Sequence, residues 1–160
     1  MTLRPLLRTD ALRLQEIGTD VVFRQIPEIP TPFDAIAWVE TKFESAVPEI
    51  AHVVIENCSG DIIGYCQVAI GIGDKSYYLD LGYWFGESYW RKGYASESVR
   101  EVLKYMKSNN WTRYPTLAKA SSDNLASRRV LEKCNFILLE PKPSFLKDEG
   151  MLMYEWRNER

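Results

Sequence analysis

A basic turn that contains a glycine is the part of the sequence whose residue types point most directly to chemistry. The segment WRKGYAS (90–96) follows an aromatic stretch with strand character and leads into a helical pattern. A helix that begins in this way leaves its first backbone N–H groups without intrahelical partners, and its dipole adds partial positive charge there. Gly93 permits positive φ, and Arg91 and Lys92 supply charged donors. We interpret the turn as a site for a phosphate or pyrophosphate.

Other phosphate-binding motifs are missing from the chain. Neither GxxxxGK[ST] nor GxGxxG occurs, and these are the glycine patterns of nucleoside-triphosphate enzymes and dinucleotide-binding proteins. A nucleoside-triphosphate enzyme is therefore a poorly supported function. A glycine turn can also be purely structural, so its meaning depends on the elements that surround it.

The totals exclude several classes of protein. The formal net charge of −2 over 160 residues argues against broad nucleic-acid or membrane binding, which would need a basic excess. No apolar stretch approaches the roughly 18 residues of a membrane span, and we see no signal peptide. Three cysteines without a CxxC pattern, Cys58, Cys66 and Cys134, argue against a disulfide framework and a structural zinc site. We expect a cytoplasmic protein with no metal.

Hydrophobic periodicity and turn residues predict one α/β domain over residues 1–160, with a mixed, mostly antiparallel central sheet and helices on both faces. Strands are predicted at residues 2–8, 52–57, 62–70, 75–85, 114–120, 136–140 and 151–156. Helices are predicted to follow Asp10, to begin at Thr31-Pro32, and to span 93–109 and 124–133, the last capped by Ser122-Asp123. We interpret the lone histidine, His52, as structural and expect Cys134 to pack.

Four motifs follow one another in a fixed order along the chain. They are Ile63-Gly64-Tyr65, Leu81-Gly82-Tyr83-Trp84, the segment YWRKGYA (89–95), and Asn124-x-x-Ser127-x-x-Val130-Leu131-Glu132-Lys133. Together they resemble the GNAT superfamily of acyl-CoA-dependent N-acetyltransferases, over nearly the whole chain. The subgroup that they resemble most is that of the bacterial ribosomal-protein N-terminal acetyltransferases. Asn135 stands where that family usually has glycine before the Phe, and Asn tolerates the left-handed conformation.

The resemblance implies a GNAT-like fold that binds acetyl-CoA at the basic turn. Two central strands would part after a bulge, and the pantetheine arm would bind the exposed backbone of Trp84, Phe85 and Gly86. The pyrophosphate would lie on the backbone amides of Arg91, Lys92, Gly93, Tyr94, Ala95 and Ser96. Asn124 would contact the pantetheine or order the reacting end, and Arg128 would reach the nucleotide phosphates.

Acetyl transfer to an amine needs a neutral amine, a donor for the oxyanion, and a proton or donor for the leaving thiolate. Asp80 is the candidate base, because it lies within the apolar run 77–85, where a carboxylate is costly unless it is paired or functional; a salt-bridged or rim-exposed Asp is the alternative. Glu87 is a second candidate in a loop. Ser127 is the candidate donor to the thiolate, and Asn124 is catalytic or merely a helix cap. Leu131 stands where some relatives carry a tyrosine acid.

The acceptor is the least determined part of the prediction. In relatives the segments matching residues 24–33 and 141–150 line the acceptor site. Glu28, Asp34 and Glu40 are acidic residues that either attract a cationic amine or are simply solvated. The resemblance favours a peptide or protein α-amine, while a polyamine, an amino sugar and an amino acid stay open. A catalytically silent acyl-CoA-binding module is the alternative function, and Trp111 is a candidate contact in a homodimer.

Overall fold

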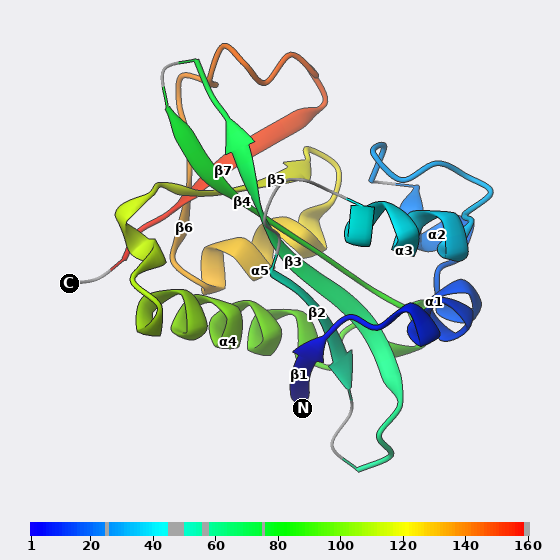
Figure 1. Cartoon of the computed structure of the whole chain (residues 1–160). Coiled ribbons are helices and arrows are strands. Elements are labelled where there is room, and N and C mark those ends of the chain that lie inside the picture. Colours follow the sequence, from blue (N-terminus) through cyan, green and yellow to red (C-terminus); the bar gives the residue numbers. More distant parts are fainter. Residues whose placement is uncertain (25, 45–49, 56–57, 75, 159–160) are drawn as a thin grey trace.

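The computed structural model describes residues 1–24, 26–44, 50–55, 58–74 and 76–158, and of residues 50–55 only the backbone. Within this described part, seven strands form one sheet in the order β1-β2-β3-β4-β5-β7-β6 (Figure 1). The strands are β1 (Thr2–Pro5), β2 (Ile50–Ile55), β3 (Ile62–Ile72), β4 (Tyr77–Phe85), β5 (Thr116–Ser121), β6 (Phe136–Leu138) and β7 (Met151–Trp156). The pair β4–β5 is parallel and the other pairs are antiparallel.

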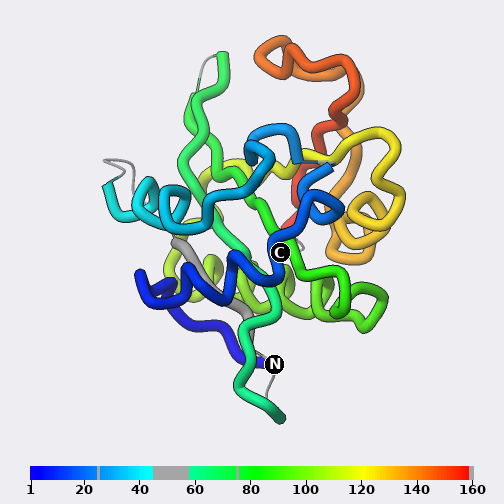
Figure 2. Tube along the Cα trace, turned by 90° about the vertical axis from the view of Figure 1, so that its right-hand side faces the viewer, coloured from blue at the N-terminus to red at the C-terminus, as the bar shows by residue number. Residues whose placement is uncertain are grey.

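Helices cover both faces of this sheet, so the predicted fold class is confirmed (Figures 1 and 2). The helical elements are η1 (Arg8–Asp10), α1 (Ala11–Ile17), α2 (Asp20–Phe23), α3 (Ala35–Glu44), η2 (Glu87–Tyr89), α4 (Tyr94–Ser108), η3 (Trp111–Arg113) and α5 (Leu125–Lys133). One core packs α4 and α5 against the sheet, and a second packs α1, α2 and α3 against the other side. Strand β4 contributes to both cores because its side chains alternate.

That alternation sorts the residues of β4 between the two faces. Leu79, Leu81 and Phe85 lie in the α4–α5 core, whereas Trp84 lies in the α1–α3 core with Tyr65 of β3. Asp80 shares the parity of Trp84, as the sequence pattern predicts, and the structure places this face against α1–α3.

The two central strands part beyond a short paired stretch. Strands β4 and β5 pair only at Leu79–Thr116, Asp80–Leu117 and Leu81–Ala118. Beyond Leu81, β4 stays with β3, whereas β5 stays with β7 as far as Ser121. We call the last shared pair, Leu81–Ala118, the fork. The expected bulge before the parting is not found in β4, whose register with β3 is continuous; the register shift in this part of the sheet lies between β2 and β3.

Several element boundaries differ from the sequence prediction because side chains cap the helices. Helix α3 begins at Ala35 rather than at Thr31, since the Asp34 carboxylate accepts a hydrogen bond from the Ala37 amide at 3.0 Å. Helix α5 is capped by Asn124, not by Ser122-Asp123. Asn135 does adopt positive φ (64°), as its residue type predicts.

Three individual predictions have different outcomes. Cys134 is buried in the α4–α5 core, as expected. The side chain of His52 lies outside the described part of the chain. Trp111 is not a free surface aromatic, because it packs on the α4–α5 core and lies edge-on to Tyr105, with ring centroids 6.4 Å apart. In the described residues, no helix combines the length and apolar character that a membrane span requires.

Candidate active site

The basic turn reaches α4 through two residues with positive φ. Arg91 has a φ of 61° and Gly93 a φ of 86°, and Tyr94 begins the helix. The first-turn amides of Ala95 and Ser96 have no intrahelical acceptors, and no described side chain caps this end of the helix. A Cβ built on Gly93 would meet no described atom within 4 Å, which leaves the outer surface of the turn open. Arg91 and Lys92 are both exposed, so the turn retains the character of an anion site.

Beyond the fork, no strand in the described part of the chain pairs with one edge of β4. The Leu79 amide donates to Pro115 O at 2.8 Å, and the Gly86 amide donates to Ile63 O of β3 at 3.1 Å. Backbone groups alternate along a strand, so the odd-numbered residues of β4 direct theirs toward β5. The amides of Tyr83 and Phe85 therefore face the opening.

This parity changes which backbone groups are accessible there. Of Trp84, Phe85 and Gly86, only Phe85 directs its amide into the opening, and its carbonyl already accepts a hydrogen bond from Trp90 Nε1 at 2.7 Å. Tyr83 is a residue that the sequence prediction did not include in the site. The signal that could have identified Tyr83 is its odd position in β4, because odd-numbered residues of this strand direct their backbone groups toward β5.

Asp80 lies one residue pair before the fork, between Ala69 of β3 and Leu117 of β5. Its carboxylate is 3.4 Å from the Lys119 ammonium, and both side chains are about one quarter exposed. Burial raises the pKa of Asp80 above its ordinary value, and the nearby Lys119 ammonium opposes this only in part. Asp80 is thus a carboxylate with an increased affinity for a proton beside the opening of the sheet.

Both segments expected near the acceptor approach the face that carries Asp80. Glu28, from the light-blue segment between α2 and α3, pairs with Lys119 of yellow β5 at 3.3 Å (Figure 2). The loop before β7 stacks Phe145 on Tyr78, with ring centroids 5.3 Å apart. It also joins the β3–β4 turn through a Ser144–Asp74 hydrogen bond, beside the hairpin in Figure 1.

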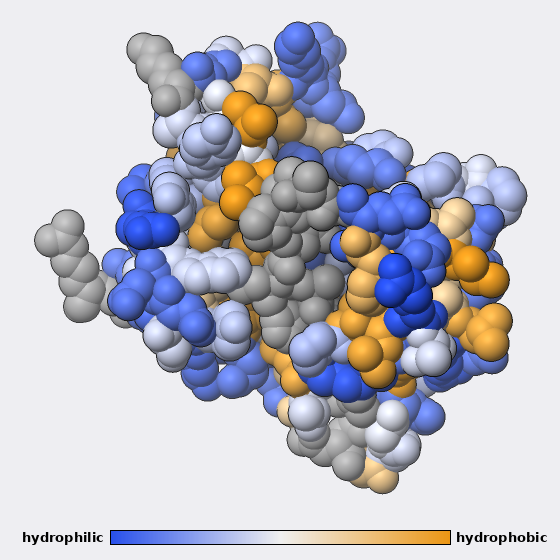
Figure 3. All heavy atoms as spheres, viewed as in Figure 1, coloured by the Kyte–Doolittle hydropathy of each residue, from blue (hydrophilic) through white to orange (hydrophobic). Residues whose placement is uncertain are grey.

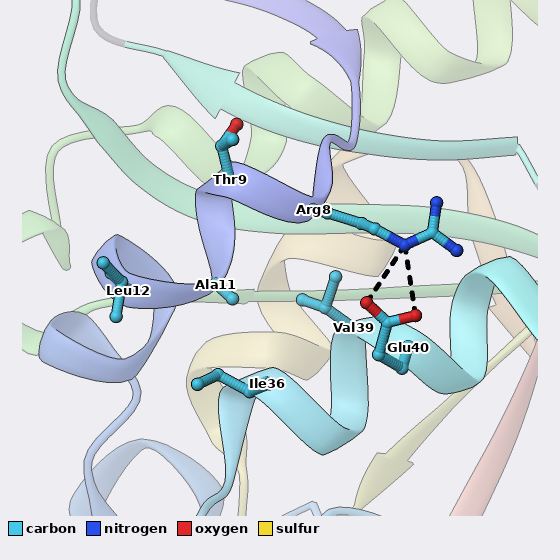
Figure 4. Close-up of a pocket in the computed structure, with 7 residues that line it drawn as sticks. All are labelled: Arg8, Thr9, Ala11, Leu12, Ile36, Val39 and Glu40. Atoms are coloured by element: carbon cyan, nitrogen blue, oxygen red, sulfur yellow. Dashed lines mark hydrogen bonds and ion pairs between the residues drawn. The ribbon is translucent and has the colours of Figure 1, made fainter.

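The other acidic candidates lie elsewhere. Asp34 caps α3, and Glu40 pairs with Arg8 at 3.0 Å in a shallow groove of about 440 Å³ between α1 and α3 (Figure 4). Leu12 and Ile36 make this groove apolar, and Figure 3 shows exposed apolar side chains over α1 and α3. None of its lining residues belongs to β4, β5, α4 or α5, so the groove is separate from the candidate active site. Glu87 is exposed in η2.

Ser127 and Asn124 meet at the start of α5. The Asn124 side chain accepts a hydrogen bond from the Ser127 amide at 3.0 Å, and the Ser127 hydroxyl lies 2.9 Å from the Tyr83 hydroxyl. Burial raises the pKa of Tyr83, so its phenol keeps its proton in the neutral range. Tyr83 and Asp80 have opposite parity in β4. The hydroxyl pair and the carboxylate therefore flank the opening from opposite faces.

Two further residues of α5 are held by the fold. Arg128 donates from Nε to the Tyr154 hydroxyl at 3.0 Å and from Nη1 to Ser122 O at 3.1 Å, which directs its guanidinium toward the protein. Leu131 is fully buried in the α4–α5 core, so this position supplies packing and no hydroxyl. Among the residues with described structure, no cluster of three or more His, Cys, Asp or Glu side chains could hold a metal ion.

Known proteins share the fold described above. Among solved structures, the acetyltransferase (GNAT family) from Bacillus anthracis has a TM-score of 0.70 at 23% identity, with 96% of this chain and 90% of that chain covered. An acetyl transfer enzyme from Salmonella typhimurium, described as modifying the N-terminal serine of 50S ribosomal subunit protein L7/L12, has a TM-score of 0.75 at 16% identity, covering 98% and 94%. At these identities the likeness shows a shared fold.

Sequence comparison goes further than the fold. The uncharacterized N-acetyltransferase YjdG of Bacillus subtilis (strain 168) is 27% identical over 154 residues, covering 83% of this chain and 90% of that relative. A family model described as an acetyltransferase (GNAT) domain matches residues 1–137. Because that match spans most of the sequence, the chain belongs to the GNAT acetyltransferase family.

Proposed function

We propose that the protein transfers the acetyl group of acetyl-CoA directly to a primary amine, with a peptide or protein N-terminal α-amine as the favoured acceptor. The observation that carries this proposal is the parting of β4 from β5 at the fork. The separation leaves a strand edge whose amides have no strand partner among the described residues, and the turn at Gly93 follows that strand. An extended arm that ends in a diphosphate complements this combination of a free strand edge and a helix N-terminus.

The residues present fit acetyl-CoA. The surface of the Gly93 turn is open where a Cβ would otherwise project, and Arg91 and Lys92 add charged donors beside it. In the proposal, amides between Arg91 and Ser96 hold the diphosphate, and amides of Tyr83 and Phe85 hold the pantetheine arm. Asn124 orders the start of α5 through its hydrogen bond to Ser127.

The proposed chemistry divides proton transfer between the two faces of β4. The neutral amine attacks the thioester carbonyl carbon, a strand amide stabilises the oxyanion, and Asp80 takes the proton that the amine loses. The carbon–sulfur bond then breaks. The thiolate receives a hydrogen bond or proton from the Ser127 hydroxyl, which contacts the protonated Tyr83. No covalent acetyl-enzyme is needed.

The acceptor class rests on two lines of support. The motifs resemble those of ribosomal-protein N-terminal acetyltransferases, and one structural neighbour is described as acting on an N-terminal serine. Glu28 and Asp80 also outnumber Lys119 where the two acceptor segments converge, which favours a cationic substrate before its deprotonation.

An amine panel with mass detection of the product and assay of free thiol release tests this function. The proposal expects one acetyl group added per thiol released, with peptides carrying a free N-terminus among the best acceptors. Leu131 favours one rival, an acyl-CoA-binding module without turnover, because this position lacks the hydroxyl that some relatives use. Binding of acetyl-CoA without thiol release above the background for any amine would establish that rival.

A further inference from the structure

An unfilled space lies on the α1–α3 face of β4, next to Asp80. Gly82 occupies the following position on this face, and it has no side chain. Among the described residues, a Cβ placed on Gly82 would come within 4 Å of Gln67 alone, at 3.7 Å from Cγ and 3.8 Å from Nε2. A small group can therefore lie over Gly82, between Asp80 and Trp84, with Gln67 beside it.

The side chain of Gln67 is held in place by a buried partner. Gln67 lies opposite Gly82 in the β3–β4 ladder, and its Oε1 accepts a hydrogen bond from the Tyr65 hydroxyl at 2.8 Å. Tyr65 is only 1% exposed, and its ring packs edge-on against Trp38. With Oε1 engaged, the Nε2 hydrogens of Gln67 remain to donate, and no described residue accepts from them.

Trp84 provides a second hydrogen-bond donor beyond Gly82. Its side chain is buried (5% exposed), and its indole Nε1 has no hydrogen-bond partner among the described residues. A buried donor without an acceptor is unfavourable, so such groups commonly bind water or a ligand. The α1–α3 face beside Gly82 therefore carries a carboxylate at Asp80 and an amide donor at Gln67, while the Trp84 donor is enclosed in the core behind it.

We propose that Gln67 recognises a carbonyl oxygen next to the acceptor amine, so that the acceptor is an α-amino acyl group such as a peptide N-terminus. This inference rests on the proposed function. The amine lies at Asp80, the neighbouring carbonyl accepts a hydrogen bond from Gln67 Nε2, and the α-carbon lies over Gly82.

The spacing of the two side chains agrees with this arrangement. Gln67 is opposite Gly82 and Ala69 is opposite Asp80, so Gln67 and Asp80 are diagonal neighbours on antiparallel strands. The Cα atoms of such residues are about 7–8 Å apart, so long side chains on the two strands can reach a common group. The nitrogen and oxygen of an α-amino acyl group are roughly 3 Å apart, so one such group is small enough to place its amine at Asp80 and its carbonyl at Gln67.

The same face disfavours two other classes of amine. A simple alkylamine has no oxygen for Gln67, so its binding would leave a preorganised donor unpaired. A free carboxylate would be drawn to Lys119, but this ammonium is already shared between Asp80 and Glu28. A neutral carbonyl, as in a peptide or an amino-acid amide, complements Gln67 without disturbing that ion pair.

The test compares acceptors that differ only in the carbonyl group. Wild-type protein is assayed with alaninamide, with a short peptide that begins with alanine, and with the branched alkylamine in which an isopropyl group replaces the carboxamide. Each kcat/KM is expressed per neutral amine. We expect wild type to prefer the carbonyl compounds by about tenfold, the value of one well-placed hydrogen bond, and Gln67→Leu to bring this preference close to one.

Two more variants separate recognition from folding. Gln67→Glu keeps the size of the side chain but replaces the donor by an acceptor, so it should reduce the preference further than Gln67→Leu does. Tyr65→Phe frees the amide to rotate and should reduce the preference less. Thermal unfolding and the KM for acetyl-CoA of each variant, compared with wild type, identify any loss that arises from misfolding.

The outcomes distinguish this inference from the function on which it rests. Equal use of the alkylamine by wild type, a preference for a short diamine, or an unchanged preference in Gln67→Leu would overturn the role of Gln67 and leave acetyl transfer intact. Binding of acetyl-CoA with no turnover of any amine would overturn both. A carbonyl preference that disappears in Gln67→Leu and falls further in Gln67→Glu is the supporting result.

Discussion

Removal of the Lys119 charge is the perturbation that examines the proposed base most directly. Lys119→Met keeps much of the length and apolar stem of the side chain but deletes the ammonium 3.4 Å from Asp80. A base accepts a proton only when it is ionised. Burial already raises the pKa of Asp80, and Lys119 is the main group that lowers it again. Its removal must therefore raise the pKa of Asp80 further, so that more of the enzyme is protonated and inactive at low pH.

The size of the effect follows from the contact. An opposite charge within about 4–6 Å typically displaces the titration of a carboxyl by about 1–3 pH units. Lys119 divides its charge between Asp80 and Glu28, and both members of the Asp80 pair are about one quarter exposed, so solvent weakens the interaction. The low end of the range applies. We expect the acid limb of the rate profile to move by about one unit toward higher pH, which is roughly 1.4 kcal/mol.

The assay is the pH dependence of kcat/KM with one peptide acceptor for all variants, so that titration of the acceptor amine is common to every curve. Below the acid limb, Lys119→Met should be about tenfold slower than wild type, and the two curves should converge at high pH. Lys119→Arg keeps the charge and should retain the wild-type limb. Lys104→Met removes an exposed lysine that pairs with Glu101 at 2.6 Å on α4, and it serves as the matched control.

Two results would refute this reasoning. An acid limb that stays in place in Lys119→Met, while the control behaves as wild type, would mean that the limb does not report Asp80. A shift toward lower pH would mean that Lys119 raises the pKa of the catalytic group, which is contrary to the ion pair in the structure. Added salt should reduce the difference between wild type and Lys119→Met, because ions screen a partly exposed pair.

Three further predictions concern the other parts of the site. Gly93→Ala and its control Gly60→Ala both place a side chain at positive φ, with no described atom within 4 Å of the new Cβ, so each variant should lose about 1 kcal/mol of unfolding free energy. Only Gly93→Ala should raise the KM for acetyl-CoA. Equal KM values in the two variants would exclude the turn from the binding site. Asp80→Asn should lower turnover by about 10²-fold. It should cause no loss of thermal stability at neutral pH, because folding raises the pKa of Asp80 and the ionised carboxylate therefore opposes folding as the pH rises through that pKa. A clear loss of stability with normal turnover would make Asp80 a structural residue. Tyr83→Phe should lower kcat by about tenfold with little change in the KM for acetyl-CoA, because Ser127 loses its partner hydroxyl. For the same reason the ultraviolet titration of the bound CoA thiol should shift to higher pH. An unshifted thiol titration would exclude a role of the Tyr83–Ser127 pair at the thiolate.

Local patterns predicted the regular elements well. Helix α4 spans Tyr94–Ser108 against a prediction of 93–109, because five buried residues recur at helical spacing along it. Strand β7 has the predicted bounds, Met151–Trp156. The start of α3 was wrong, because a proline after Thr31 resembled a first helical turn, whereas the Asp34 carboxylate provides the actual cap. A cap depends on which of several nearby polar side chains reaches the first amides, and residue types alone do not settle that.

For the candidate site, too, some features followed from local sequence and others did not. Parity along β4 was sufficient to place Asp80 on one strand face with Trp84, and the chain order of the motifs was sufficient to indicate the family. Neither could show that Lys119 would reach Asp80, that Glu28 would reach Lys119, or that Arg128 would bind Tyr154 and Ser122. Each of those contacts joins strands or loops that are distant in sequence, and it exists only after the sheet has set their order.

The sequence by itself determined the succession of strands and helices, the glycine turn before α4, and the residues that share a strand face with Asp80, because these follow from spacing and from the conformational limits of single residues. Only the tertiary structure decided which backbone edge is exposed at the fork, which charges surround Asp80, and that Gln67 lies beside Gly82. The physical reason is that pairing register and ion pairs each depend on two segments that are distant in sequence, so the pattern within one segment does not specify them.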